Sequence, residues 1–410
     1  MGIACFVNVW RVHFGRNFVS AAYVASKQHP ALREWCEVRV KHDTGSCIAA
    51  GNRPTASTIH LPLSEPHLKL CTGREEIPDP PLKNLLTDIA GVRVGHADDA
   101  RLASGVTAIV FDRPAVAAID VRGGGPGTRE DALLHLDNAV DRIDAIALAG
   151  GSAFGLDAGG GVQAWLAEQG RGLVVRSAVI PIVPGAIIFD LLNGGDKAWG
   201  RFPPYRDLGY AAAIAADVDF ALGSVGAGYG ATTANFKGGL GSASAVTPGG
   251  VTVAALAVVN AVGSVTIGDG PWFWAAPFEV GGEYGGRGMP ASFTPEMLAM
   301  RIKRAATATE NTTLAVVVTD AALTKPLARR LAMIAHTGFA RAIYPVHAPH
   351  DGDVLFAAAM GEKPVDPLAG LTELGMVAAN VVARAIARGV YTATALPFAG
   401  ALPAWEDRFG

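Results

Sequence analysis

The sequence predicts a layered α/β protein with a large core. Half of its 410 residues are apolar and only 17% are charged, against roughly 25% charged residues in a typical soluble domain. Several expected strands are continuous apolar runs, which indicates that both of their faces are covered. Two architectures satisfy this pattern: two sheets packed on each other with helices outside, and a doubly wound parallel sheet.

The expected elements follow one another from residue 84 onward. Apolar runs bounded by turn residues predict these strands: Val106–Phe111, Val116–Val121, Ala145–Ala149, Leu173–Arg176, Val251–Val259, Gly263–Ile267, Thr313–Thr319 and Ala342–Tyr344. The segments expected to form helices are Ser152–Glu168, Lys325–His336, Val354–Met360 and Leu371–Arg388. Ser152 and Thr324 suit the N-cap position of the first two helices, because a hydroxyl there can accept a hydrogen bond from a free N–H group.

Residues 1–80 differ in composition from the rest of the chain. They hold all four cysteines, five of the ten histidines and only five of the fifty glycines. No CxxC spacing is present, so scattered thiols are favoured over a zinc site. Pro78-Asp-Pro-Pro81 marks a boundary. We therefore expect an N-terminal extension of unknown role over residues 1–80 and a functional domain over residues 84–410.

Charge and hydropathy argue against several classes of partner. A net charge of -3 gives no electrostatic reason to bind nucleic acid or an anionic membrane. The apolar segment Val251–Ile267 is near the lower length limit for a membrane span, but its β-branched residues and its bend near Asn260 predict two buried strands. The start of the chain lacks the pattern of a secretory signal. We expect a cytoplasmic protein.

Three glycine clusters invite comparison with nucleotide-binding loops. They span Gly123–Arg129, Gly150–Gly155 and Gly226–Gly230, and none has the spacing of a phosphate loop or a dinucleotide fingerprint. Tight turns and close approach of the backbone explain them better. The second cluster opens an expected helix, whose free N–H groups could hold an anion or a carbonyl oxygen. The candidate substrate-binding residues of this turn are Gly150, Gly151 and Ser152.

Common catalytic patterns are missing from the sequence of residues 84–410. There is no GxSxG elbow for a Ser-His-Asp triad. The cluster of His347, His350, Asp351 and Asp353 has no spacing tied to a defined ligand geometry, so no metal site is predicted.

Two weaker signals remain. An Asn311-Thr312 step stands at the mouth of an apolar strand, and Asp351-Gly-Asp353 precedes an apolar run. Taken alone, the first is a strand-entry turn, and the two aspartates are helix caps. Together with other segments they form a pattern that a known family shares.

From about Leu86 to its end, the chain resembles the self-cleaving amidohydrolases, which include the L-aminopeptidase D-amidase/esterases, the β-peptidyl aminopeptidases and the nylon-oligomer hydrolases. The resembling segments are Val121–Glu130, Leu148–Asp157, Asn235–Gly241, Asn260, Asn311–Leu314, Thr319-Asp320 and Asp351–Asp353. The Asn311-Thr312 step with the paired aspartates is most similar to the nylon-oligomer (6-aminohexanoate-oligomer) hydrolase branch. The resemblance implies a four-layer α/β/β/α sandwich of the aminopeptidase-amidase/ornithine acetyltransferase type.

The resemblance also implies self-cleavage between Asn311 and Thr312. The Thr312 hydroxyl would attack the preceding carbonyl and water would hydrolyse the resulting ester, giving an α chain to residue 311 and a β chain of residues 312–410 that stays its partner. The freed α-amino group, with an ordinary pKa of about 8, can act as general base for its own hydroxyl. Thr312 is then the nucleophile toward small amides, peptides or linear amide oligomers.

Other roles follow by position within the resemblance. Asn260 resembles a donor to the oxyanion, and Lys237 resembles a lysine that hydrogen-bonds the Thr312 hydroxyl or stabilises developing negative charge. Asp351 and Asp353 would accept hydrogen bonds from the ammonium or hydroxyl group of Thr312. Without the resemblance, the same residues are a strand-bend asparagine, a surface or salt-bridge lysine and two caps.

Phe189 stands near the point where related enzymes commonly place a tyrosine in the active-site wall. It is expected to contact substrate without that hydroxyl, which affects the substrate range more than the self-cleavage. Two other functions stay open, an acyltransferase of the same fold and a catalytically inactive binding member. The chain lacks the Thr-Met-Leu cleavage context of the acetyltransferase, which disfavours the first. The implied mechanism needs no cofactor, and a homo-oligomer, tetrameric or larger, is expected.

Overall fold

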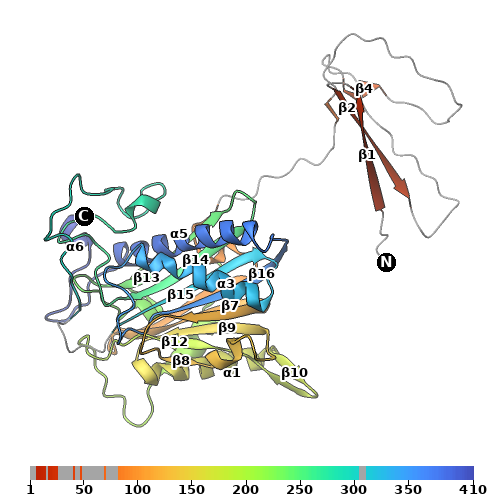
Figure 1. Cartoon of the computed structure of the whole chain (residues 1–410). Coiled ribbons are helices and arrows are strands. Elements are labelled where there is room, and N and C mark those ends of the chain that lie inside the picture. The colour runs from red at the N-terminus through yellow and green to blue at the C-terminus, as the bar shows by residue number, and fades with distance from the viewer. Residues whose placement is uncertain are drawn as a thin grey trace, which may run out of the picture. The chain divides into compact units, whose positions relative to one another are not determined.

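The computed structural model describes residues 82–303 and 311–410, together with five strands between residues 6 and 70. The chain forms two compact units, Met1–Pro80 and Pro81–Gly410. The cysteine side chains, on which the scattered-thiol interpretation rests, lie outside the described residues. Strands of the first unit form a hairpin and a small sheet (Figure 1): β1 (Phe6–Phe14), β2 (Asn17–Ala25), β3 (Val40–Lys41), β4 (Cys47–Ile48) and β5 (Lys69–Leu70).

The second unit contains a mixed sheet of nine strands, in the order β13-β14-β15-β16-β7-β9-β12-β8 with β6 paired to β7 (Figure 1). Among these strands the β9–β12 and β15–β16 pairs are parallel and the other pairs antiparallel, which excludes a doubly wound parallel sheet. The strands are β6 (Val92–Asp99), β7 (Ser104–Val121), β8 (Thr128–Arg129), β9 (Arg142–Ala149), β12 (Gly185–Ile187), β13 (Gly239–Val246), β14 (Thr252–Asn260), β15 (Thr312–Ala321) and β16 (Val354–Lys363). A separate hairpin consists of β10 (Leu173–Val175) and β11 (Ala178–Ile180).

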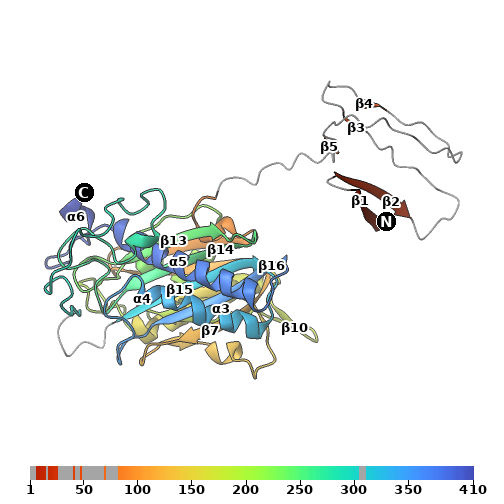
Figure 2. The same ribbon diagram turned by 45° about the horizontal axis from the view of Figure 1, so that its top comes forward.

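Helices cover the sheet from two sides. α3 (Lys325–Ala335) and α5 (Ala369–Tyr391) lie side by side across one face (Figure 2), and α1 (Ala158–Glu168) and α2 (Tyr205–Ile214) pack against β7 and β9. The shorter helices are α4 (Thr337–Ala340) and α6 (Glu406–Phe409). The 3₁₀ turns are η1 (Leu86–Asp88), η2 (Asp131–Leu134), η3 (Ser152–Asp157), η4 (Gly226–Gly228) and η5 (Ala276–Phe278).

Three apolar cores define four layers. The first lies between the sheet and α3 and α5, and includes Val317 and Val382. The second lies between the two halves of the sheet and includes Val316 and Ile146. The third lies between β9 and α1 and includes Val162. Val316 and Val317 are consecutive on β15 and belong to different cores, so this strand is covered on both faces. The predicted α/β/β/α sandwich is confirmed.

The two halves of the nine-stranded sheet face each other as the two β layers of the sandwich, and the long strand β7 belongs to both halves. Its first part pairs with β6 and β9 and its last part pairs with β16. The pairing with β9 shifts register between Val110 and Ala115. The predicted strands Val106–Phe111 and Val116–Val121 are therefore two parts of one strand, and this strand joins the two sheets into a single hydrogen-bonded path.

Four element predictions need correction. Val354–Met360 belongs to strand β16 and not to a helix, because a short apolar run without periodicity fits a strand buried on both faces as well as a helix. Within the described residues, Gly263–Ile267 and Ala342–Tyr344 contribute isolated bridges and no strand. Ser152–Glu168 begins as the 3₁₀ turn η3 before α1. Apart from the two segments that are joined in β7, the other predicted elements are confirmed to within three residues at each end.

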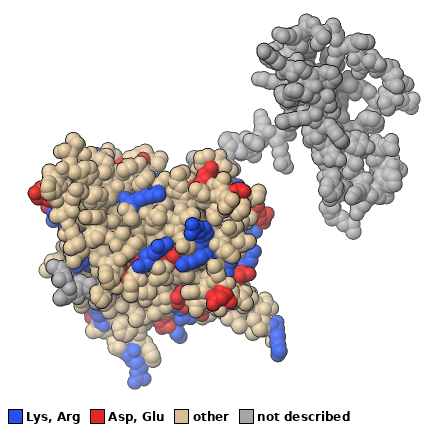
Figure 3. Space-filling view, viewed as in Figure 1, with Lys and Arg blue, Asp and Glu red and all other residues tan. Residues whose placement is uncertain are grey.

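One face of the second unit carries few charged groups (Figure 3). On the face that Figure 3 shows, Lys and Arg and Asp and Glu side chains are scattered among uncharged ones. This distribution agrees with a charged fraction of 17%.

Among the described helices, α5 is long and apolar enough to cross a membrane by length and composition alone. Its most apolar 18-residue window has a mean hydropathy of 1.3, and 61% of that window is buried inside the protein. The helix packs on β13 and β14. Such burial is typical of a core helix, which meets the same length and composition criteria.

The backbone of α5 comes very close to β13. A Cβ atom added to Gly241 would lie 2.0 Å from the carbonyl oxygen of Ala385 and 2.4 Å from the nitrogen of Gly389. Real Cβ atoms do not approach backbone atoms this closely. Glycine at position 241 is therefore required by the packing of helix on sheet.

Gly241→Ala is expected to lower the free energy of unfolding by about 1–3 kcal/mol, because the helix must move away from the sheet. The midpoint of urea unfolding measures this loss. Gly160→Ala, in α1, is the matched control, since its Cβ would come no closer than 3.4 Å to a neighbouring atom. Alanine there favours the helix by up to about 1 kcal/mol. Equal midpoints for the two variants would contradict the close packing of α5 on β13.

Candidate active site

Polar side chains meet at one end of four neighbouring strands. Asn260, the last residue of β14, is the direct partner of Thr312, the first residue of β15. β15 and β16 run parallel, and Asp353 immediately precedes β16. Lys237 stands two residues before β13, which is antiparallel to β14. The fold therefore brings these four predicted site residues, Lys237, Asn260, Thr312 and Asp353, to the same end of neighbouring strands, and this end is called the edge of the sheet below.

The Asn311–Thr312 peptide is buried at this edge. The Thr312 hydroxyl donates to the carbonyl oxygen of Asn311 over 2.5 Å, and the N–H group of Gly352 donates to the same oxygen over 2.9 Å. Both donors polarise this carbonyl group, and the N–H group of Gly352 is placed to stabilise negative charge on its oxygen. A Cβ atom on Gly352 would lie 2.3 Å from Thr312 Oγ1, so only glycine permits this approach.

Asp351 and Asp353 are both buried beside this peptide. Asp353 Oδ1 accepts the N–H group of Thr313 over 2.7 Å, and Asp353 Oδ2 lies 2.8 Å from His347 Nδ1. Asp351 Oδ1 accepts the N–H group of Gly352 over 3.0 Å. Burial, and next the neighbouring charge of Asp353, raise the pKa of Asp351 well above its usual range. The pair therefore keeps one proton near neutral pH.

Backbone glycines hold the loop that carries the two carboxyl groups. Gly125 N–H donates to the carbonyl oxygen of Asp351 over 2.8 Å, and Gly123 N–H donates to that of Asp353 over 3.2 Å. A Cβ atom on Gly123 would lie 2.2 Å from the Asp351 oxygen. Close backbone approach, as predicted, explains this part of the glycine cluster. Because a strand follows Asp353, the interpretation of the aspartates as helix caps is wrong.

Asn260 is fully buried and is held at both ends of its amide group. Its Oδ1 accepts from the N–H group of Thr232 over 3.0 Å and from Lys303 Nζ over 2.8 Å. Its Nδ2 donates to the carbonyl oxygen of Phe189 over 3.1 Å. These partners fix the orientation of the amide, with its donor side toward Phe189. Phe189 thus contacts the site through its main chain.

A pocket of about 280 Å³ adjoins these residues, and its lining includes Phe189, Asp190, Lys237 and Lys303. Lys237 is buried, and its Nζ donates to two carbonyl oxygens, those of Gly228 over 3.1 Å and Gly238 over 2.7 Å. The expected hydrogen bond from Lys237 to the Thr312 hydroxyl is not formed in this uncleaved chain.

Burial lowers the pKa of Lys237 to about 7, although the charge of Asp190 opposes the shift. At neutral pH this amine therefore exchanges its proton readily. Because its hydrogen-bond partners are carbonyl groups, the interpretation of Lys237 as a salt-bridge lysine is not supported. The structure instead presents a buried amine whose charge depends on pH close to neutrality.

The Gly150-Gly151-Ser152 turn does not offer free N–H groups to a ligand. Each amide donates within the chain: Gly150 to Gly105 O, Gly151 to Asp190 Oδ1 and Ser152 to Ile188 O. The prediction that these amides hold an anion or a carbonyl oxygen is therefore wrong. The turn instead orients the Asp190 carboxyl group, which lines the pocket.

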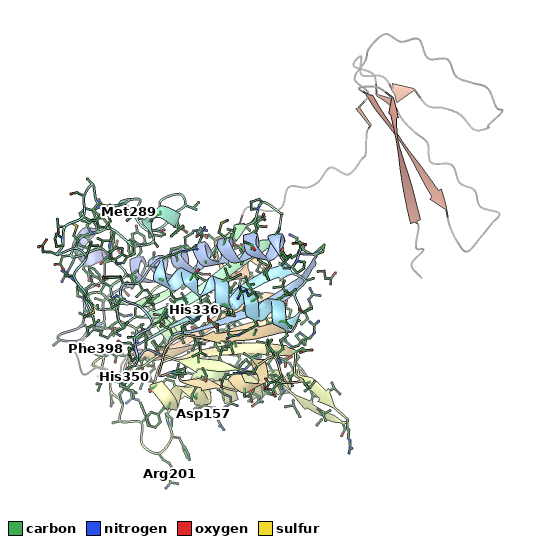
Figure 4. The ribbon with its side chains drawn as sticks, viewed as in Figure 1. Asp157, Arg201, Met289, His336, His350 and Phe398 are labelled. Carbon is green, nitrogen blue, oxygen red and sulfur yellow. The ribbon has the colours of Figure 1, made fainter. Side chains whose placement is uncertain are left out.

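Three residues of the site were not predicted: His347, Lys303 and Gly352. Gly352 stands between the two predicted aspartates, so its position was a usable signal. His347 had been considered only as a metal ligand together with His350, and it pairs with Asp353 instead, while His350 is exposed (Figure 4). Within residues 82–303 and 311–410, no three His, Cys, Asp or Glu side chains are grouped to hold a metal ion.

The sequence is similar to known proteins over most of its length. The model of peptidase family S58 matches residues 84–401. An uncharacterized aminopeptidase of Mycobacterium tuberculosis is 44% identical over 346 residues, which are 80% of this chain and 98% of that protein. The 6-aminohexanoate-oligomer endohydrolase of a Kocuria species is 30% identical over 333 residues, 76% of this chain and 85% of that protein. Identity is thus higher with the mycobacterial aminopeptidase.

Solved structures share the fold. The L-aminopeptidase D-Ala-esterase/amidase of Ochrobactrum anthropi, described as a variant of the Ntn hydrolase fold, superposes with a TM-score of 0.58 at 19% identity, over 78% of this chain and 90% of that one. A Burkholderia β-aminopeptidase superposes with a TM-score of 0.57 at 23% identity, with the same coverage. At these identities the likeness shows the fold alone.

Fold, site and sequence lead to the same assignment. The four layers match an Ntn-type aminopeptidase, and the family match extends over more than three quarters of the chain. The relatives are named aminopeptidases and an amide-oligomer hydrolase. The chain belongs to peptidase family S58 and is a hydrolase that acts on amide bonds.

Proposed function

We propose that the chain is a self-cleaving aminopeptidase-type amidohydrolase whose nucleophile is the N-terminal Thr312 of the cleaved β chain. The observation that carries this proposal is the Asn311–Thr312 peptide. Its carbonyl oxygen receives both the Thr312 hydroxyl and the N–H group of Gly352. The strand register places Asn260 directly opposite, and two carboxyl groups lie alongside.

Self-cleavage begins when Thr312 Oγ1 attacks the carbonyl carbon of Asn311. The hydroxyl proton passes to a base, a C–O bond forms, and negative charge develops on the Asn311 oxygen, where Gly352 N–H already donates. The C–N bond breaks as the Thr312 nitrogen takes up a proton, leaving an ester between Asn311 and the Thr312 side chain. Water hydrolyses the ester to a carboxylate on Asn311 and a free hydroxyl on Thr312.

The base changes between the two stages. Before cleavage Thr312 has no free amino group, so another group must accept its hydroxyl proton. Lys237, with a pKa of about 7, is largely neutral just above that pH. It suits this role once the Thr312 hydroxyl turns toward it, because in the uncleaved chain that hydroxyl donates to the Asn311 oxygen and Lys237 donates to two carbonyl groups. Asp351, which keeps its proton, suits the role of acid toward the leaving nitrogen. After cleavage the α-amino group of Thr312, with an ordinary pKa of about 8, becomes the base for its own hydroxyl.

The same atoms then act on a second amide. A substrate carbonyl takes the position that the Asn311 carbonyl occupies, with its oxygen toward Gly352 N–H. The pocket of about 280 Å³ beside Lys237 and Phe189 offers room for the acyl part. This volume fits a small amide, a short peptide or the end of a linear amide oligomer, the substrate class for which one relative is named.

The purified chain is expected to run as two bands of about 32 and 10 kDa, in proportion to residues 1–311 and 312–410 of a 42.2 kDa chain. Mass spectrometry should find Thr312 at the start of the smaller chain. Thr312→Ala removes the hydroxyl and should leave one uncleaved, inactive chain. Thr319→Ala, which changes another buried threonine of β15, is the control and should cleave. A Thr312→Ala variant that still cleaves would rule out the mechanism.

Gly352→Ala is expected to block self-cleavage, since its Cβ would displace the Thr312 hydroxyl from the carbonyl group. The rate of band conversion on a denaturing gel should fall about 100-fold or more. Gly125→Ala is the matched control in the same site, because its Cβ would meet no atom closer than 3.7 Å. Equal rates in the two variants would show that the close approach at Gly352 has no role in catalysis.

Self-cleavage should depend on pH through Lys237. Because the neutral amine is the active base, the first-order rate should rise about tenfold per pH unit below pH 7. It should fall again above about pH 8, where Asp351, the proposed acid, loses its proton. Lys237→Met should lose this dependence and slow cleavage about 100-fold. Lys363→Met, at an exposed lysine, is the control. A rate that falls as pH rises through 7 would remove Lys237 from the role of base.

A further inference from the structure

His347 is a histidine beside the carboxyl pair to which the mechanism above gives no role. Its Nδ1 lies 2.8 Å from Asp353 Oδ2, and its main-chain N–H donates to the same oxygen over 3.3 Å. The other oxygen, Asp353 Oδ1, accepts the N–H group of Thr313 over 2.7 Å. Both oxygens of Asp353 are therefore acceptors toward backbone amides, which can only donate.

This arrangement assigns the proton of the pair. If Asp353 carried the proton of the carboxyl pair, one of its two oxygens would become an O–H donor. Each of these oxygens already faces a backbone N–H group, which is also a donor. Asp351 has a hydrogen bond with Asp353, and its pKa is raised by burial and by the charge of Asp353. The consistent arrangement is a protonated Asp351 that donates to an ionised Asp353, with His347 donating through Nδ1–H.

The groups behind His347 hold its ring in place. His336 meets the ring edge-on, with 4.9 Å between ring centroids, and Phe339 packs at 5.7 Å. His336 Nδ1 is 2.9 Å from Asp120, and this carboxylate also pairs with Arg329 and Arg122. Figure 4 marks His336 on the side of the sheet that α3 covers. His336 is thus paired with Asp120, and the histidine that pairs with Asp353 is His347.

The backbone also fixes the position of His347. Its φ angle is +57°, in the left-handed region. Glycine adopts this conformation freely, and Asn and His adopt it more readily than most residues. Its side chain is 26% exposed, so a change there need not open the core. Position 347 therefore accepts two informative substitutions, one without a donor (His347→Gly) and one with a short amide donor (His347→Asn).

We propose that His347 is a positioning residue for the Thr312 reaction: by donating Nδ1–H to Asp353 it keeps that carboxyl group ionised and holds the shared proton on Asp351. An acid of fixed position then stays beside the Asn311–Thr312 peptide, and the carboxylate stays on the N–H group of Thr313. The effect on rate rests on the proposed self-cleavage. The proton assignment rests on the geometry of the uncleaved chain.

Nitrogen NMR of the Thr312→Ala chain, labelled at histidine, tests the proton assignment without any cleavage. At about pH 8 His347 should show the Nδ1–H tautomer, with its signals assigned by their loss in His347→Asn. The Nε2–H tautomer would overturn the inference, because Nδ1 would then accept a proton from Asp353. If the wild-type chain does not cleave, the proposed function fails and the tautomer alone decides this inference.

Rates of self-cleavage test the consequence. His347→Gly should cleave about tenfold more slowly, the effect of losing one hydrogen bond to a charged group, and His347→Asn should stay within about threefold of wild type. Thermal unfolding of both in the Thr312→Ala background separates a loss of rate from a loss of fold. His350→Asn, at the exposed neighbour, should cleave normally. Wild-type rates in His347→Gly, or equal slowing in two equally stable variants, would overturn the role of the donor.

Discussion

The register of β14, β15 and β16 is the constraint on which the site depends. Strand hydrogen bonds pair Asn260 with Thr312 and start β16 beside β15. Because side chains alternate along a strand, a slip of one residue would turn the Thr312 hydroxyl to the opposite face. Val316 and Val317 oppose such a slip, since each fills a different apolar core. The packing of the four layers thus sets the position of the Thr312 hydroxyl oxygen.

The burial that fixes the register also sets the acid–base chemistry. In water Lys237 would be a cation and Asp351 an anion at neutral pH. Removal of water disfavours both charges, which lowers the pKa of Lys237 to about 7 and raises that of Asp351. Both groups can then exchange protons where the reaction needs a base and an acid. Their hydrogen bonds to backbone groups keep the remaining polar atoms satisfied.

Sequence reasoning predicted the layers and the residues that the fold brings together around the Asn311–Thr312 peptide, but not the contacts between distant segments. Continuous apolar runs predicted β14 and β15, yet the same kind of run over Val354–Met360 was assigned to a helix, because it has no period to separate the two. The turn at Gly151 was predicted to have free amides, since its acceptor Asp190 lies 39 residues away. Lys303 was missed because nothing local indicates that it reaches Asn260 across 43 residues.

The three residues of the Asp351-Gly-Asp353 segment have separate roles around the Asn311–Thr312 peptide, and no single residue could combine them. In the proposed proton assignment, Asp353 is the carboxylate that accepts N–H groups on both oxygens, so it does not supply a proton. A second carboxyl group is needed for that, and the charge of the first helps it to keep its proton. Between them, Gly352 has no side chain to exclude the Thr312 hydroxyl, and its N–H group donates to the Asn311 oxygen, on which charge would develop in the proposed self-cleavage. The order of these three residues along the chain therefore follows from the chemistry of the peptide they surround.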